Sequence, residues 1–121
     1  IPAELGAEAA AAEYASRLAD VPEFDLVLLG MGEDGHTASL FPGRVWTGAD
    51  ALAVHNAPKP PPDRVSLSAG RLANCRAVWL VVTGVGKREA LMRWEAGEIL
   101  PAASVRGCLS TLLWMDRAAA V

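Results

Sequence analysis

The chain has 121 residues, of which 52% are hydrophobic and 21% charged, and its formal net charge at pH 7 is −3. This length and composition predict a single folded domain, residues 1–121, and exclude an intrinsically disordered chain. Charges of both signs are interspersed without a basic stripe, so nothing indicates a nucleic-acid partner. No apolar run approaches the roughly 20 residues that span a bilayer. The N-terminus carries no secretion signal, so we expect no membrane partner and a cytoplasmic location.

The elements expected along the chain alternate between helical and extended segments. Alanine-rich residues 2–20 favour a helix, and the apolar runs 24–29, 76–83 and 110–115 favour strands that are buried on both faces of a parallel sheet. The remaining expectations are a short helical turn at 37–40, strands at 51–55 and 64–68, a stiff proline-rich connector at 57–63, a helix that Ser68 caps, a helix at 87–96 and a short helix at 102–105. Strands separated by helices predict an α/β fold with helices on the faces of the sheet.

The segment that bears chemistry is the loop GMGEDGHTASLFPG, Gly30 to Gly43, which directly follows the first apolar strand. Its first six residues fit the dinucleotide pattern G-x-G-x-x-G. That pattern must open a long helix, however, and Pro42 stops any helix within two turns. Glu33 and Asp34 would also place negative charge where a pyrophosphate requires bare amides. The loop is therefore not interpreted as a dinucleotide site.

His36 and Asp34 are the candidate catalytic residues of this loop. Histidine exchanges protons near neutral pH, and a carboxylate two residues away can orient the imidazole. Such a pair is typical of hydrolytic sites that need a general base. The alternative is that His36 only caps a helix or binds a buried carbonyl group.

The histidines and cysteines indicate no metal site. His36 and His55 are the only histidines, and neither has a second ligand at helical spacing. Cys75 and Cys108 lie far apart without a CxxC partner, and we expect both to be buried thiols in a reducing compartment.

Two basic residues are candidates for binding a substrate anion. Lys87 follows Gly84-Val85-Gly86 at the start of a helix, where backbone amides and a point charge can bind an anion. Arg64 follows the stiff proline-rich segment. The alternative for each is a solvated surface charge.

The sequence resembles the 6-phosphogluconolactonase family. The loop GMGEDGHTASLFPG is similar to the signature of that family, and three further segments follow in the family's order: KPPPDRVSLS (59–68), WLVVTGVGKREAL (79–91) and LLWMDRAAA (112–120). The related glucosamine-6-phosphate deaminases share GxGxDGH but continue differently from the TASLFP of residues 37–42. The resemblance covers nearly the whole chain after Phe24.

The resemblance implies a Rossmann-like, three-layer α/β/α fold with a mostly parallel sheet (NagB/RpiA/CoA-transferase-like). It implies hydrolysis of 6-phospho-D-glucono-1,5-lactone to 6-phosphogluconate without metal or cofactor. His36 would be the general base, and Asp34 would position it. Amides around Gly30, Gly32 and Gly35 would border the substrate, and Arg64 and Lys87 would contact its phosphate or hydroxyl groups.

The resemblance also implies that the chain is a C-terminal portion of such a domain. The family's first βα unit, its serine-glycine-glycine phosphate loop and its aspartate-glutamate-arginine segment have no counterpart here, so the chain alone is expected to be weakly active or inactive. A deaminase or isomerase and a non-catalytic sugar-phosphate-binding module are the alternatives. The sequence leaves the oligomeric state open, with a monomer as one option.

Overall fold

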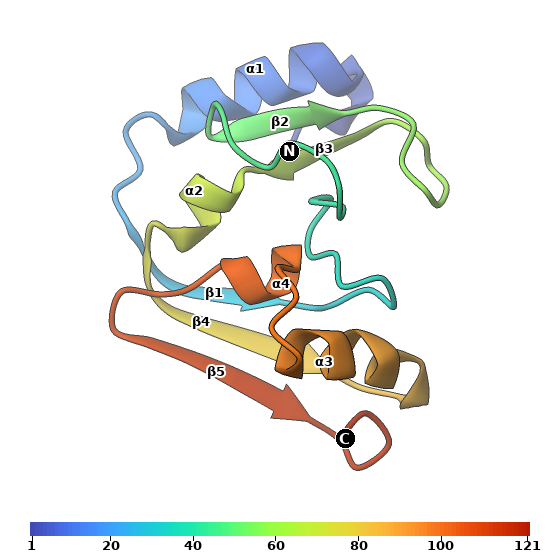
Figure 1. Ribbon diagram of the computed structural model, residues 1–121. Coiled ribbons are helices and arrows are strands. Elements are labelled where there is room, and N and C mark those ends of the chain that lie inside the picture. Colours follow the sequence, from blue (N-terminus) through green and yellow to red (C-terminus); the bar gives the residue numbers. More distant parts are fainter.

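The computed structural model describes residues 1–121 and contains a parallel sheet with helices in front of it (Figure 1). The sheet has the strand order β1-β4-β5, and an antiparallel pair, β2 and β3, lies beside it. The strands are β1 (Phe24–Leu29), β2 (Ala51–Val54), β3 (Arg64–Leu67), β4 (Cys75–Val82) and β5 (Ser110–Met115). The helices are α1 (Ala7–Leu18), α2 (Ala69–Ala73), α3 (Arg88–Glu95) and α4 (Pro101–Ser104), with the 3₁₀ turns η1 (Ala3–Leu5) and η2 (Val85–Lys87). None of these helices has the length and apolar character that a bilayer crossing requires.

The hydrophobic core lies between one face of the parallel sheet and the helices α2, α3 and α4. Val78 and Leu80 of the central strand β4 are fully buried, and Leu29 of β1 faces the same side. Leu91 of α3 and Ala102 of α4 complete this cluster from the helical layer. Alternate residues along each strand point to opposite faces, so this packing uses only half of each apolar run.

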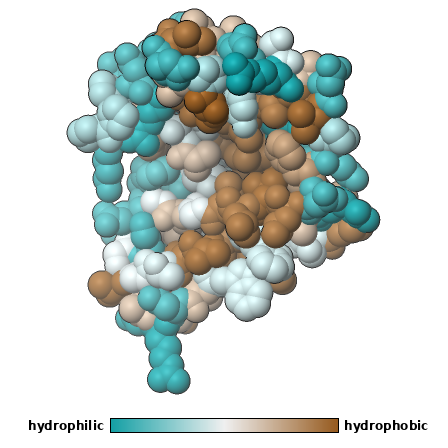
Figure 2. All heavy atoms as spheres, turned by 180° about the vertical axis from the view of Figure 1, so that it is seen from behind, coloured by the Kyte–Doolittle hydropathy of each residue, from teal (hydrophilic) through white to brown (hydrophobic).

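The opposite face of the sheet is bare, which corrects the expectation that the three apolar strands are buried on both faces. Its large apolar side chains are between 37% and 64% exposed; they are Leu26, Leu28, Trp79, Val81, Leu112 and Trp114. Figure 2 shows the molecule from this side, with apolar side chains gathered on the surface. Both connections, β1 to β4 and β4 to β5, step in the same direction across the sheet. Right-handed crossovers in one direction place their helices on one face, so the other face stays uncovered.

Three local expectations were wrong in whole or in part, for identifiable reasons. The helix expected at 2–20 is interrupted at Gly6, whose φ of +83° is not helical, so α1 begins at Ala7. Residues 37–40 form no helical turn, because Thr37 and Leu40 pair as an isolated β-bridge around Ala38 at φ +50°. Cys75 is buried, which raises the pKa of its thiol, but Cys108 is exposed.

The expected cap on α2 is confirmed, because the Ser68 hydroxyl accepts a 3.1 Å hydrogen bond from the Arg71 amide.

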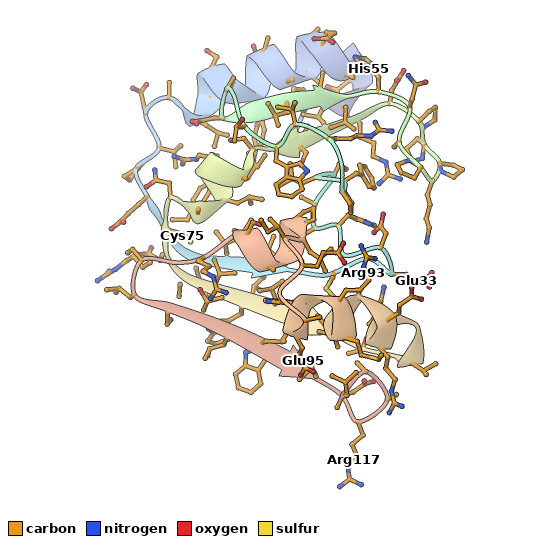
Figure 3. All side chains as sticks on the ribbon, viewed as in Figure 1. Glu33, His55, Cys75, Arg93, Glu95 and Arg117 are labelled. Atoms are coloured by element: carbon orange, nitrogen blue, oxygen red, sulfur yellow. The ribbon has the colours of Figure 1, made fainter.

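A second, smaller packing unit joins α1 to the β2–β3 pair. Ala10 and Ala11 of α1 are buried, which permits the helix to lie close to these strands. At the end of β2, His55 bridges two acidic side chains: its Nε2 lies 2.8 Å from Glu8 of α1 and its Nδ1 lies 2.9 Å from Asp63. Figure 3 shows His55 at the end of the helix. The hydrogen bonds to Glu8 and then Asp63 raise the pKa of His55 above its ordinary value of 6.5.

This bridge predicts a pH-dependent contribution to stability. Because the folded-state pKa is raised, the contribution of the His55 cation is complete below pH 6.5 and is lost as the pH rises through the folded-state pKa. We expect urea midpoints of the wild-type chain to fall between pH 6 and pH 8.5 by more than those of His55→Gln. As a control, Arg17→Gln removes the exposed pair with Glu13 on α1 and should keep the wild-type slope, because arginine does not titrate in this range. Equal slopes for His55→Gln and the wild type would contradict the prediction.

Candidate active site

The glycine loop leaves the carboxyl end of β1 and folds back on itself through short-range hydrogen bonds. The Gly32 amide donates to the carbonyl of His36 at 2.8 Å, and the Gly35 amide donates to the carbonyl of Gly32 at 3.0 Å. The hydroxyl of the buried Thr37 donates to the carbonyl of Gly30 at 2.8 Å. These bonds satisfy the backbone of the tight turn and fix where the side chain of His36 can lie.

Asp34 and His36 form the central polar contact of the loop. One carboxylate oxygen of Asp34 accepts from the His36 amide at 3.0 Å and lies 2.5 Å from Nδ1 of the same residue. Burial alone would raise the pKa of Asp34, but the hydrogen bonds from the amide and ring of His36 outweigh it and lower that pKa below 3.8. An ionised carboxylate accepts a hydrogen from Nδ1, which leaves Nε2 as the unprotonated nitrogen of the neutral ring. The pair is therefore arranged as an oriented base.

Two of the predicted glycines are required by close approach. A Cβ at Gly32 would overlap the imidazole ring of His36 and lie 2.9 Å from Oδ1 of Asp34. Gly35 has φ +88°, and a Cβ there would lie 2.8 Å from the side chain of Leu100. At Gly30, by contrast, an added Cβ meets nothing within 4 Å. The loop thus needs glycine at its second and third glycine positions for different reasons.

Phe41 connects His36 to two arginines. Its ring, 2% exposed, lies 4.7 Å from the ring of His36, centroid to centroid. The guanidinium carbons of Arg44 and Arg64 lie 5.8 Å and 5.5 Å from the same phenyl ring. Trp46 donates from Nε1 to the carbonyl of Phe41 at 2.6 Å. The position of His36 is therefore fixed by packing as well as by its hydrogen bonds.

A cavity of about 350 Å³ opens beside this loop. Its walls come from the loop itself, from the proline-rich segment and from the turn before α3; the lining residues are Gly30, Met31, Gly32, Glu33, His36, Thr37, Ala38, Lys59 and Lys87. A second cavity of about 370 Å³ is lined mainly by apolar side chains of α3 and β5 and contains no histidine. The first cavity combines a potential base with basic side chains, which makes it the candidate active site.

The structure gathers most of the predicted site residues, but not all of them. Gly30, Gly32, His36 and Lys87 line the cavity, and Asp34 reaches it through His36. Gly35 packs behind the loop against Leu100. The Arg64 guanidinium donates instead to backbone carbonyls, from Nε to Pro61 at 3.0 Å and from one terminal nitrogen to Lys59 at 2.7 Å and Pro60 at 3.2 Å. A direct contact between Arg64 and substrate stays a prediction.

Sequence reasoning missed Lys59 and Glu33 as neighbours in the cavity. Lys59 lies in the run that was interpreted as a stiff connector, and only its position before three prolines indicated a constrained side chain. Glu33 was considered only as an obstacle to pyrophosphate. In the structure the Lys59 ammonium lies 3.7 Å from the Glu33 carboxylate.

The turn that carries Lys87 is held by the C-terminal segment. Asp116 accepts hydrogen bonds from the Ala119 amide at 2.7 Å and from the Gly84 amide at 3.1 Å, which together lower its pKa. The side chain of Arg88 donates to the carbonyl of Ala118 at 2.8 Å. Lys87 therefore projects from a turn that is fixed on both sides.

The structure holds no group of three or more histidine, cysteine, aspartate or glutamate side chains placed to bind a metal ion.

The parallel sheet presents the Asp34–His36 pair on a glycine loop at the carboxyl end of β1, where open α/β sheets place their ligand sites. Residues 1–114 match the family of glucosamine-6-phosphate isomerases and 6-phosphogluconolactonases, and the chain belongs to this family.

Named relatives and a solved structure agree with this assignment. The 6-phosphogluconolactonase of Streptomyces coelicolor is 45% identical over 128 residues, covering 93% of this chain and 49% of the relative. The human 6-phosphogluconolactonase is 40% identical over 130 residues, covering 97% of this chain and 50% of the relative. The crystal structure of 6-phosphogluconolactonase from Thermotoga maritima matches with a TM-score of 0.80 and 31% identity, covering 89% of this chain and 50% of that one. The chain spans about half the length of the curated relatives it matches.

The crowding at Gly32 yields a test of the Asp34–His36 pair. Gly32→Ala should push the imidazole off the carboxylate, because the added methyl group occupies the volume of the ring. We expect the Asp34 pKa, followed by carboxyl-carbon NMR, to rise toward 3.8 as its hydrogen bonds to His36 are lost. Gly30→Ala is the matched control, since its Cβ meets nothing, and it should leave this titration unchanged. A low pKa retained in Gly32→Ala would show that the pair tolerates the methyl group.

Proposed function

We propose that this chain carries the catalytic base of a 6-phosphogluconolactonase, which hydrolyses 6-phospho-D-glucono-1,5-lactone to 6-phosphogluconate. The observation that carries the proposal is the His36 ring, held through Nδ1 by Asp34 and lining a cavity that contains Lys87. A neutral imidazole oriented in this way can accept a proton from water at neutral pH. The names of the curated relatives and their identities of about 40% support the same reaction.

On this proposal the reaction proceeds in two steps. A water molecule attacks the lactone carbonyl carbon while Nε2 of His36 takes one of its protons, which forms a tetrahedral intermediate. The bond from that carbon to the ring oxygen then breaks, and the leaving oxygen receives the proton from His36 and becomes the hydroxyl group of the open sugar acid. The base is regenerated, and the negative charge of Asp34 stabilises the imidazolium that exists between the two steps.

The loop backbone restricts which amides can serve the reaction. The amides of Gly32, Gly35 and His36 already donate within the loop. They shape the turn and are not available to a carbonyl oxygen of the substrate. Gly32 instead lets the backbone and the His36 ring lie close together, and Lys87, which lines the same cavity, would bind the phosphate group.

The deaminase and isomerase alternative has less support. The sequence of residues 37–42 departs from the deaminase pattern, and the relatives reported above are named as lactonases. A non-catalytic sugar-phosphate-binding module would bind ligand without turnover, and the kinetic test below separates it from an enzyme. A cytoplasmic location stays a prediction.

We further propose that residues 1–121 form a C-terminal portion of a lactonase-like domain and that the bare sheet face packs against the rest of that domain. All-parallel sheets normally carry helices on both faces, and here the exposed leucine, valine and tryptophan side chains have no cover. Curated relatives are about twice as long as the chain, which leaves room for a second helical layer. On this proposal the chain alone is weakly active or inactive.

His36 and His55 give a paired kinetic prediction. In a protein that contains this chain together with the rest of its domain, His36→Ala should lower the rate of lactone hydrolysis by about 10²- to 10⁴-fold, the usual contribution of a general base. His55→Ala should retain most of the rate, because His55 bridges Glu8 and Asp63 on the surface. Hydrolysis of freshly generated lactone, corrected for its spontaneous rate, measures both. Equal rates in the two variants would remove His36 from the mechanism, and ligand binding without any turnover in the wild type would favour the non-catalytic module.

Tryptophan fluorescence tests the proposal for the bare face. Trp79 and Trp114 are 37% and 53% exposed, so iodide should quench their emission in the 121-residue chain. In the domain-length protein the same two residues should be protected, since the second layer would cover them. Trp79→Phe and Trp114→Phe assign the signals, and a variant that retains only Trp46 and Trp94 is the control that should change little. Equal quenching of Trp79 and Trp114 in both proteins would contradict the proposed packing.

A further inference from the structure

Both lysines of the chain line the candidate active site. Lys59 and Lys87 are the only lysines in the sequence, against a larger number of arginines. They come from different parts of the fold, Lys59 from the segment between β2 and β3 and Lys87 from the turn before α3, yet they border one cavity with His36. A lysine ammonium group carries a compact charge and three hydrogen-bond donors, which suits it to bind a phosphate group. Lysines scattered over the surface would not border a single cavity.

The backbone at Lys59 is held in place by two arginines. Arg64 donates to the carbonyls of Lys59, Pro60 and Pro61, and Arg44 donates to the carbonyls of His55 at 2.6 Å and Asn56 at 2.5 Å. The Ala57 amide closes the base of the segment on the carbonyl of Pro62 at 2.9 Å.

These arginines also tie the segment to the catalytic loop. Both guanidinium groups lie beside the ring of Phe41, which in turn packs on His36. The Lys59 backbone therefore has a fixed position relative to His36, while its side chain is largely exposed.

The ammonium group of Lys59 is only weakly engaged within the protein. Its ion-pair partner is Glu33, at 3.7 Å, and the two side chains are 64% and 63% exposed. Exposed pairs of this kind contribute little to stability, so an anion of higher charge can replace the carboxylate at low cost. Glu33 also extends toward the turn of Lys87, because a Cβ at Gly86 would lie 3.2 Å from its carboxylate oxygen. Figure 3 shows Glu33 on the side of the molecule where the loop and the start of α3 meet.

We propose that Lys59 binds the phosphoryl group of the substrate together with Lys87, and that Glu33 lies between the two lysines and competes with that group. The inference rests on the proposed function for the identity of the substrate as a phosphorylated sugar acid or lactone. It assigns to the proline-rich segment a binding role, for which Arg64 and Arg44 hold the backbone. It also separates the two charges by task, since Lys59 and Lys87 act on the phosphoryl group and His36 acts on the carbonyl carbon.

The two lysines permit a site-resolved binding experiment on the 121-residue chain. Reductive methylation with carbon-13 formaldehyde retains the positive charges and gives one NMR signal for each lysine, which single Lys→Arg variants assign. Titration with 6-phosphogluconate should shift both signals, and titration with gluconate, which lacks the phosphate group, should shift neither at the same concentration and ionic strength. A shift at Lys87 alone, or at neither lysine, would overturn the proposal.

The affinity for 6-phosphogluconate is then measured on unmethylated variants. We expect substitutions of the two partners of the ion pair to change it in opposite directions. Lys59→Gln should weaken binding of 6-phosphogluconate about 10-fold, the usual effect of losing a charge-assisted contact. Glu33→Gln should tighten binding about threefold, because it removes a competing negative charge. Arg117→Gln removes a positive charge that points into solvent away from Glu33 and is the matched control (Figure 3). If Lys59 served only to pair with Glu33, Lys59→Gln would no longer weaken binding in a chain that already carries Glu33→Gln, and that result in the double variant would refute the inference.

The binding role of Lys59 and the reaction assigned to His36 can fail independently. If lactone hydrolysis does not depend on His36 while Lys59 still binds the phosphorylated acid, the reaction is wrong and the phosphate site stands. If hydrolysis depends on His36 but Lys59→Gln changes neither the affinity for 6-phosphogluconate nor KM for the lactone, the reaction stands and the role of Lys59 is wrong.

Discussion

The hydrogen bonds between Asp34 and His36 are the constraint on which the candidate site depends. A single carboxylate oxygen accepts from both the amide and the ring of the same histidine, which fixes the backbone and the imidazole together. That arrangement requires Gly32, since no other residue leaves space for the ring, and it keeps Asp34 ionised by lowering its pKa. The local turn, the tautomer of the base and its orientation toward the cavity therefore have a common physical origin.

Phe41 extends this constraint from the loop to the rest of the site. It is almost fully buried, and it contacts His36 on one side while two arginines lie beside its ring. Cations beside an aromatic ring contribute roughly 0.5–1 kcal/mol each at exposed positions, and more when they are desolvated. Arg44 also binds carbonyls just before the proline-rich segment, and Arg64 binds carbonyls within it, so Phe41 links the position of His36 to that of the segment that carries Lys59.

Much of this arrangement could be predicted from the sequence, and the failures have specific causes. The strands at 24–29 and 110–115 were placed correctly, because their apolar runs are bounded by clear breaks. The Asp34–His36 pair was predicted because two residues on a tight glycine turn must lie close together. The bare face could not be predicted from apolar runs alone, since Leu26 and Leu28 are as apolar as the residues that are buried.

The proline-rich segment shows a different limit of sequence reasoning. Prolines indicate stiffness but not direction, and the backbone at Lys59 is held by Arg64, five residues later in the chain, whose side chain donates to backbone carbonyls. Such side-chain to main-chain bonds across several residues leave no periodic signal. Arg64 was predicted to contact substrate because it follows this stiff segment, but in the structure its Nε donates to the segment and Arg64 does not line the cavity.

The position of β1 at the edge of the sheet has a consequence for assembly. β1 pairs with β4 on one side only, and its carboxyl end leads directly into the loop that carries His36. Any further parallel strand that pairs with the free edge of β1 must end beside the same loop, because parallel neighbours run in one direction. If the strand order reverses at β1, the neighbouring connections leave the sheet in opposite directions. They then form the crevice in which open α/β sheets bind ligands. Completion of the sheet and completion of the catalytic cleft would then be one event, so that a folding partner for β1 would also act as a component of the site.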